Sequence, residues 1–517
     1  MKKSKTKTFF IFLIFLLFVK TDYRLENTIN CCGDDFDYYS HAYTLAVDFD
    51  FNYENQIPEF SKFYYTNGDK IAPVGFSGSG ILASPFLFIG NLLDTSYSYT
   101  EKPFNFKILF YSFSPIFYLL LSVILLQKSI FLLNKNISRL TLLVLLSGSG
   151  VAYFALERYS MTHVYEVFIN SLIIYLSTSA FKTNKRQYFA LIPFAIFLGL
   201  LVKLSNFYIL LIPLIVKELL NLKFSNKIFN FQNKMSFLLG VVSATLFFIF
   251  LNFKIYGKVI LNPGETYSAQ SQLSNYLGTT INFVDFFFEI ANTLIIVLFS
   301  QEFGIIWFAP SIFILLLFIF QFLINKKYLL FIYISISVFS NIAIVNLWQS
   351  AGSSYGYRYL FSLIPLGVFV FKVSGFNLNG KIYKYYLLPL SIFGLFSIFI
   401  FEATPYVQLA TSEVVNSFGK SIRYTQPEYL SGVLSSLIIL DGYLKLFATS
   451  FLGLIVFKLF LTIFDVTGFY NILDNLGLPL NNPDFVVLIS KIEEITLLQI
   501  SLFTVMIYSL TTQIVKK

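Results

Sequence analysis

The chain has 517 residues, of which 56% are hydrophobic and only 13% are charged, and its mean hydropathy is +0.70. Such a composition leaves too little polar surface to cover a water-soluble globule, so we expect an integral membrane protein. The formal net charge is +9. Because the basic residues fall in short clusters between apolar runs, this charge does not indicate a nucleic-acid partner.

Apolar runs close to the ~20 residues that a helix needs to cross a bilayer recur along the chain. The first, residues 8–19, follows a basic start and resembles a secretory signal, but no small-residue cleavage site follows it, so we favour an uncleaved first span. We count about 13 spans and predict an all-α membrane bundle. Other clear runs are residues 110–126, 235–253, 304–324, 328–346, 385–401 and 446–464.

Basic clusters mark the cytoplasmic side of a membrane protein. Here they occupy the first seven residues and residues 128–139, 182–186, 217–234, 326–327 and 372–384. This pattern predicts a multi-pass protein of the cell membrane with its N-terminus inside. The predicted outward loops are residues 20–105, 156–163, 203–206, 254–281, 347–359 and 402–430.

The first outward loop, residues 20–105, is the longest polar stretch and is where we expect any chemistry. It contains the acidic sequence CCGDDFDYYSHAYTLAVDFDFNYENQ at residues 31–56. Cys31 and Cys32 are the only cysteines, and a disulfide between neighbours would be strained, so we interpret them as free thiols. The Gly- and Pro-rich segment that follows the acidic stretch is too broken for a normal span and is predicted to lie along the membrane surface or dip into it. We expect one or two short surface helices in this first outer loop.

Residues 33–54 resemble the first loop of bacterial multi-spanning glycosyltransferases of the GT-C superfamily, relatives of the protein mannosyltransferases and the aminoarabinose transferase. Four later segments fit the same pattern in order: PVGFSGSGILASPF, ERYSMTHVYEVF, SQEFGIIWFAP and WQSAGSSYGYRYLFSLIP. The resemblance implies a transmembrane catalytic core over residues 1–402, with the outer loop 20–105 included. It leaves residues 403–517 as a variable C-terminal transmembrane region.

The resemblance implies an inverting enzyme of the cell envelope. The enzyme would move a sugar from a polyprenyl-phosphate donor to a lipid, glycan or protein acceptor at the outer face, among membrane lipids. Such a transfer needs a carboxylate that takes the acceptor's proton as the new glycosidic bond forms. Asp34 matches the family's aspartate, and Asp35 and Asp37 are the next candidates. A loop simply solvated by its acids remains the alternative.

Three departures from the family pattern bear on the site. Asp34 and Asp35 stand where the family has Asp-Gly, Tyr53 and Glu54 stand where it has Asn-Glu, and Lys203 replaces a common arginine. The resemblance nevertheless implies substrate contacts at Tyr38, Tyr39 and Glu54.

A phosphate leaving group needs cationic donors at the outer face, and Arg358 is the best candidate because a guanidinium can clamp two phosphate oxygens. Lys203 is the second. It interrupts an apolar run, where an unpaired charge is expensive, so we also expect it to have a partner. Arg158 and His163 are further candidates for substrate contacts, although a lone histidine is more often a hydrogen-bonded structural residue.

Asp48 and Asp50 have the Asp-x-Asp spacing with which some glycosyltransferases hold a divalent cation. A solvated acidic loop explains the same spacing, so both interpretations stay open and no cofactor is required.

Two other functions share the predicted architecture. A transporter of lipid-linked sugars should have paired charges near the membrane centre and two related halves, and neither is evident. An O-antigen-type polymerase or ligase usually has its main functional loop late in the chain. Lys420 and Arg423 in the late outward loop keep that alternative open.

Overall fold

A computed structural model shows a mostly helical protein. It describes residues 33–56, 64–96, 105–156, 158–220, 230–261, 265–266, 294, 297–298, 305–348, 358–374, 379–391 and 451–475. The predicted all-α class is therefore confirmed for this part of the chain. The run at residues 8–19, the two cysteines and most of residues 392–517 lie outside it.

The first outward loop and the long helices after it give these elements: α3 (Gly33–Tyr43), η1 (Thr44–Asp48), β1 (Tyr64–Asn67), β2 (Lys70–Pro73), α4 (Gly78–Ser96), α5 (Phe106–Leu132), α6 (Arg139–Leu146), η2 (Ser147–Val151), α7 (Ala152–Leu156), α8 (His163–Thr183), α9 (Arg186–Val202), η3 (Leu204–Leu211), α10 (Ile212–Leu219) and α11 (Phe231–Tyr256). The two strands pair antiparallel as a short hairpin, with Tyr65 opposite Ala72.

The later elements are α14 (Ile305–Phe308), α15 (Pro310–Ile324), α16 (Tyr328–Trp348), η5 (Arg358–Leu363), α17 (Ile364–Val373), α18 (Asn379–Ile382), η6 (Tyr383–Leu387) and α23 (Phe451–Asn475). The run at residues 304–324, expected as one span, is divided into α14 and α15 at Ala309. Proline explains the break, because Pro310 disfavours a helical conformation at the residue before it and is well placed to begin a new helix.

Four described helices are long and apolar enough to cross a membrane: Phe106–Leu132, Arg139–Leu156, His163–Thr183 and Phe231–Tyr256. Polar side chains define their beginnings: Asn105, Ser138 and Asn230 accept hydrogen bonds from the first-turn amides of α5, α6 and α11. At the other end, Gly257 in a left-handed conformation closes α11.

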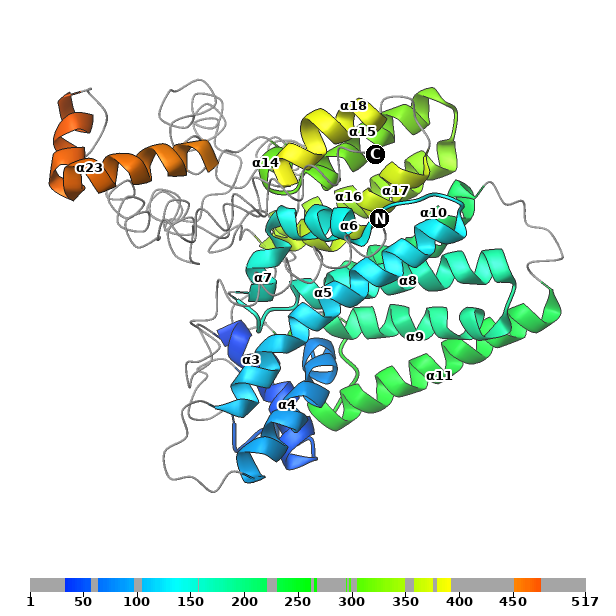
Figure 1. Ribbon diagram of the computed structural model, residues 1–517. Coiled ribbons are helices and arrows are strands. Elements are labelled where there is room, and N and C mark those ends of the chain that lie inside the picture. The colour runs from blue at the N-terminus through cyan, green and yellow to red at the C-terminus, as the bar shows by residue number, and fades with distance from the viewer. Residues whose placement is uncertain are drawn as a thin grey trace, which may run out of the picture.

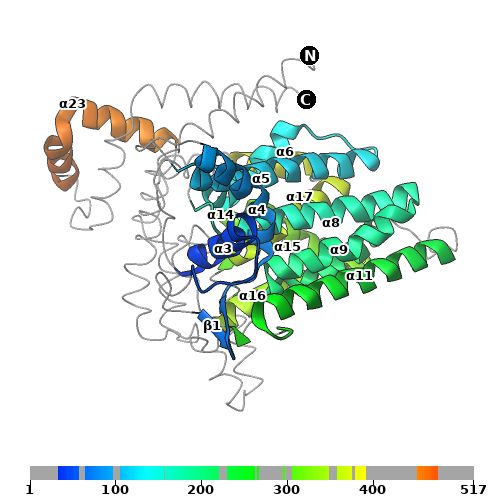
Figure 2. The same cartoon turned by 90° about the horizontal axis from the view of Figure 1, so that it is seen from below.

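The long helices pack in sequence, with α5 against α8, α8 against α9 and α9 against α11. Figures 1 and 2 show α8, α9 and α11 side by side. Of the later helices, α17 packs against α8, and α15 packs against both α16 and α17. The outermost helix, α11, leaves many large apolar side chains exposed, as a lipid-facing helix would.

Helices α3 and α4 lie at one end of these long helices (Figure 1), so the expected short helices of the first loop are present. The segment expected to be too broken for a span forms one helix, α4, despite Pro85. Two glycines bring it close to its neighbours. A Cβ at Gly78 would lie 2.3 Å from the backbone nitrogen of Val202, and one at Gly80 would lie 2.4 Å from Cβ of His41. The GSG sequence therefore packs α4 against both α3 and the end of α9.

Candidate functional site

The two neighbouring aspartates at the start of α3 have different surroundings. Asp35 is fully buried, and its Oδ2 accepts hydrogen bonds from Nε and Nη2 of Arg158 at 3.0 and 2.7 Å. Its Oδ1 accepts a further bond from the hydroxyl of Ser160. Burial raises the pKa of Asp35, and the Arg158 guanidinium opposes that rise. Asp35 and Arg158, predicted as a catalytic and a substrate-binding residue, are thus joined to one another.

Asp34 is partly exposed, and its carboxylate makes no hydrogen bond to any residue that the structure describes. It lies close enough to Arg358 for the two charges to interact. Of the two aspartates, Asp34 is therefore the one with oxygens free to meet another molecule.

The third acid of α3, Asp37, is buried and accepts a hydrogen bond from the backbone N–H of Gly75 at 3.1 Å. Burial raises the pKa of Asp37 to about 7, a value that would suit a general base. The side chain is only 4% exposed, however, and faces Gly75. Its geometry fits the anchoring of the 74–76 segment better than contact with a substrate.

The carbonyl of Gly75 completes this anchor. It accepts hydrogen bonds from Nε2 of His41 at 2.8 Å and from the Tyr256 hydroxyl at 3.0 Å. Because Nε2 must then carry the proton, Nδ1 of His41 accepts from the Tyr53 hydroxyl at 2.8 Å. Burial lowers the pKa of His41 to about 4, so the ring is neutral at neutral pH.

The tyrosines predicted to contact substrate are largely packed. Tyr38 is buried with its ring against Gly75. The ring of Tyr39 packs against the rings of Tyr43 and Tyr111, with centroids 5.8 and 5.1 Å away. Glu54, by contrast, is exposed, and its backbone N–H donates to Oδ1 of Asn52.

The candidate cation ligands are occupied by the loop itself. Oδ2 of Asp48 accepts from the side-chain amides of Asn55, at 3.1 Å, and Gln56. Oδ1 of Asp50 accepts from the backbone N–H of Asn52 at 3.0 Å. Among the described residues, no group of three histidines, cysteines or acids could hold a metal ion. These contacts fit a loop-shaping role for Asp48 and Asp50 better than metal ligation.

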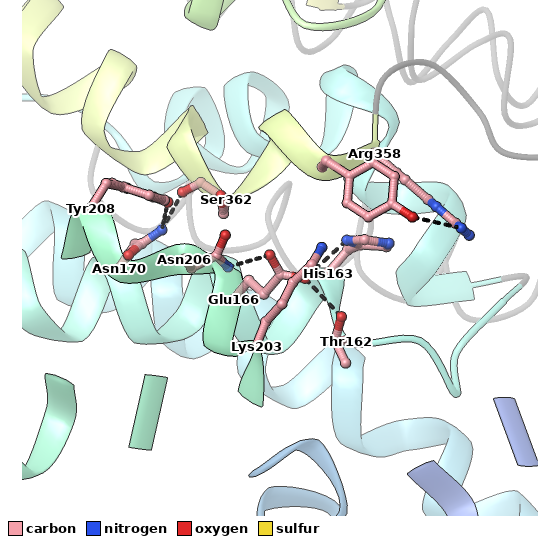
Figure 3. A network of polar contacts seen from close by, with 10 residues as sticks. Thr162, His163, Glu166, Asn170, Lys203, Asn206, Tyr208, Arg358 and Ser362 are labelled. Atoms are coloured by element: carbon pink, nitrogen blue, oxygen red, sulfur yellow. Dashed lines mark hydrogen bonds and ion pairs between the residues drawn. The ribbon is translucent and has the colours of Figure 1, made fainter. Parts of the chain in front are cut away.

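A second cluster surrounds Glu166, one turn into α8 (Figure 3). The Glu166 carboxylate is 3% exposed. It accepts hydrogen bonds from the Thr162 hydroxyl at 2.7 Å and from Nδ2 of Asn206 at 2.6 Å. Nζ of Lys203 and Nδ1 of His163 lie 3.4 and 3.0 Å from its Oε1. Lys203 thus has the partner that its position in an apolar run predicted.

Lys203 and Arg358 meet at the ring of Tyr359. The Lys203 Nζ lies 4.3 Å from the ring centroid, and the Arg358 Cζ lies 5.1 Å from it. Both distances suit cation–π attraction. Arg358 Nη2 also donates to the Tyr359 hydroxyl at 3.3 Å. One aromatic ring therefore holds together two side chains, Lys203 and Arg358, that are far apart in the sequence.

Arg358 is 9% exposed, and its Nε has no hydrogen-bond partner among the described residues. A buried donor without a partner is costly, so such a group points to a ligand. Asp34, Lys203, His163 and Arg358 are therefore linked in one region, directly or through Tyr359 and Glu166.

Glu166, Asn206 and Tyr359 were missed by the sequence analysis. Glu166 carried the clearest signal, because a carboxylate in an apolar helix needs a partner as much as the lysine does. Nothing in the sequence marks Tyr359 among 34 tyrosines.

Comparisons of the chain with protein-family models, with curated proteins and with solved structures found no match. Its function therefore has to be argued from these side chains and their geometry.

Proposed function

We propose that the chain is a multi-pass membrane glycosyltransferase of the GT-C type. It would have about 13 transmembrane helices, its N-terminus inside and its active site facing outward. It transfers a sugar from a polyprenyl-phosphate donor to an acceptor hydroxyl or amine at the outer face of the membrane.

One observation supports this proposal above the others. The partly exposed carboxylate of Asp34, free of hydrogen bonds among the described residues, lies near the buried guanidinium of Arg358, whose Nε also lacks a partner there. Sugar transfer from a lipid phosphate needs one base and one phosphate-binding cation close to each other. These two groups supply that combination.

In the proposed reaction, the acceptor's oxygen or nitrogen attacks the anomeric carbon while the Asp34 carboxylate takes its proton. The bond between the anomeric carbon and the phosphate oxygen breaks, and its electron pair stays on that oxygen. Arg358 stabilises the negative charge that develops there, more strongly in the transition state than in the bound donor. A single displacement of this kind inverts the anomeric configuration.

The remaining charged residues have supporting roles. Arg158 and Asp35 hold the start of α3, and hence Asp34, in place. Lys203 adds positive charge next to Tyr359, although Glu166 balances it. Asp35, predicted as a catalytic candidate, and Arg158, predicted as a substrate contact, are therefore assigned a structural role that positions Asp34.

The experiment is a transfer assay with the purified protein in lipid nanodiscs, labelled polyprenyl-phosphate sugars and a panel of lipid, glycan and peptide acceptors. Asp34→Asn keeps the side chain's size and removes the base, so it should lower the rate on the order of 10²-fold or more with donor binding retained. Asp50→Asn is the matched control and should keep full activity, because Asp50 is in the same loop and its side chain accepts a hydrogen bond only from Asn52 among the described contacts.

The same assay separates the alternatives. A transporter would move labelled lipid between leaflets without forming a new glycosidic bond. Lys420 and Arg423, on which the ligase alternative depends, lie outside the described residues. Full activity of Asp34→Asn would remove the assigned base.

A further inference from the structure

His163 is a buried histidine with an unusual hydrogen-bond arrangement. It is the first residue of α8 and is 2% exposed. Its Nδ1 lies 3.0 Å from Oε1 of Glu166. Nδ1 is not aligned for a regular hydrogen bond to that oxygen, and Nε2 has no partner among the described residues. The other histidine, His41, uses both ring nitrogens.

The contacts of Glu166 assign the proton on His163. The carboxylate accepts from Thr162 and Asn206 and has Lys203 beside it, which is the pattern of an ionised, acceptor-only group. A nitrogen lone pair 3.0 Å from such an oxygen would repel it, so we assign the proton to Nδ1. In the neutral ring, Nε2 is then a lone pair with nothing to accept.

The groups that face His163 come from four elements. Glu166 is on α8 itself, Lys203 lies between α9 and η3, Arg358 and Tyr359 begin η5, and Phe154 of α7 packs on the ring with centroids 4.4 Å apart. Figure 3 shows His163 with Glu166 on one side and Arg358 on the other. Lys203 and Arg358 both disfavour a second proton on the ring, and a bound anion would offset that repulsion.

We propose that His163 is a proton-coupled phosphate ligand: when a phosphate group binds against Arg358, Nε2 takes up a proton from solvent and donates a hydrogen bond to a phosphate oxygen. The Glu166 carboxylate, 3.0 Å from Nδ1, attracts the proton on that nitrogen and so leaves Nε2 to face the ligand. The phosphate supplies the negative charge that makes the imidazolium stable between Lys203 and Arg358.

This inference rests on the proposed function only for the origin of the phosphate. Sugar transfer converts a phosphodiester with one negative charge into a phosphomonoester with up to two. A ligand that gains a proton as that charge appears would stabilise the leaving group more than the intact donor. His163 would then favour the forward reaction and hold the lipid phosphate after transfer.

The chain's histidine content makes a direct test possible, because it has only two histidines. Isotope-labelled histidine in the full-length protein in nanodiscs gives two imidazoles for NMR, and His163→Gln identifies which is which. Decyl phosphate, a single-chain phosphomonoester, is the main probe, and inorganic phosphate is the second. We expect decyl phosphate at about pH 7 to convert the His163 ring from the neutral to the doubly protonated form. His41, bonded at both nitrogens, should not respond.

The two probes separate the possible sources of the ligand. A response to both means that the site binds the phosphate group alone, and a response only to decyl phosphate means that the alkyl chain is also needed. Either result supports the proposal. A His163 ring that stays neutral at saturating decyl phosphate, or the absence of any phosphate binding by phosphorus NMR, overturns it.

A binding variant adds a second readout. His163→Gln keeps an amide donor but cannot take up a proton, so between about pH 6 and pH 8 its affinity for decyl phosphate should lose the part of the pH dependence that comes from the histidine. The part that comes from the second ionisation of the phosphate, with a pKa of about 6, should remain in both proteins. Its affinity at the lower pH should fall on the order of tenfold, as expected for the loss of a charged hydrogen bond. The unchanged His41 signal reports that the variant is folded. These experiments measure no sugar transfer, so a negative result for His163 would leave the proposed function intact. A negative transfer assay would likewise leave the phosphate-binding role of His163 intact.

Discussion

Arg158 donates two guanidinium hydrogen bonds to a single carboxylate oxygen of Asp35, at 3.0 and 2.7 Å, and so connects the α7–α8 junction to the start of α3. Asp35 is fully buried and the Arg158 side chain is 10% exposed. Asp34, the preceding residue in the sequence, has no such bond among the described contacts and stays partly exposed. Two adjacent aspartates therefore have separate tasks.

Asp35→Asn should mainly destabilise the protein, because it leaves the Arg158 guanidinium buried without its counter-charge. Breaking a buried pair from one side typically costs about 3–5 kcal/mol. Asp34→Asn should leave stability near that of wild type, since its carboxylate has no hydrogen bond to lose among the described residues. Thermal midpoints in detergent, followed by size-exclusion chromatography, compare the two. Equal midpoints for the two variants would contradict this division of tasks.

Glu166→Gln should weaken both the fold and phosphate binding, because the partly buried ammonium group of Lys203 would lose its compensating charge. The ammonium group of Lys203 would be drawn toward solvent and away from the Tyr359 ring. Without that contact, the ring would hold Arg358 less firmly. We expect a lower thermal midpoint and roughly tenfold weaker binding of decyl phosphate.

The matched control is Glu265→Gln, which removes the exposed ion pair with Lys258. Exposed pairs contribute little, so both measurements should stay at the wild-type value. If Glu166→Gln behaved like Glu265→Gln, the cluster around Glu166 would have no part in the site.

The sequence was sufficient for the helical class and for several helix positions. Residues 110–126, 235–253 and 328–346, expected as spans, lie within α5, α11 and α16, because a long apolar run has few other structures available to it in a membrane. It also indicated that Lys203 needs a partner. The cost of a lone charge in an apolar run is a local property, but the identity of the partner, Glu166, depends on how α8 meets η3.

Other features were not accessible from the sequence. The difference between Asp34 and Asp35 depends on the direction in which each side chain leaves α3. Neighbouring residues of a helix point about 100° apart, and only the packing around α3 determines which direction is buried. The Gly- and Pro-rich segment that contains GSG was predicted to lie along the membrane surface or dip into it, whereas the structure uses Gly78 and Gly80 for close packing. That role depends on the atoms of His41 and Val202, which are distant in sequence.

Gly80→Ala should destabilise the contact between α4 and α3. The added methyl group would lie 2.4 Å from Cβ of His41 and 2.8 Å from the backbone nitrogen of Ala42, so one helix has to move. Overpacking of this kind costs about 1–3 kcal/mol. Ser79→Ala is the matched control, because the Ser79 hydroxyl is buried without a hydrogen-bond partner among the described residues. A thermal midpoint for Gly80→Ala as high as that of Ser79→Ala would show that the contact is not tight.

The anchor at Gly75 should give the protein a characteristic dependence on pH. The pKa of Asp37 is raised from 3.8 to about 7, so its contribution to stability is complete below about pH 4 and is lost as the pH rises toward 7. The pKa of His41 is lowered from 6.5 to about 4, so its contribution is complete above about pH 6.5 and is lost as the pH falls toward 4. The two groups bind the N–H and the carbonyl of the same residue, Gly75, and their pH effects oppose each other.

Asp37→Asn should separate these two effects. The asparagine carbonyl can still accept the hydrogen bond from the Gly75 N–H, but it has no charge to acquire in the buried site. We therefore expect the variant to match wild type at about pH 4 and to be more stable than wild type at about pH 7.5, where the ionised Asp37 is penalised by burial. The dependence that remains, a gain in stability up to about pH 6.5, belongs to His41. Thermal midpoints of wild type and Asp37→Asn at three pH values measure this difference. A variant less stable than wild type at the higher pH would mean that the charged carboxylate, and not the neutral acid, holds Gly75.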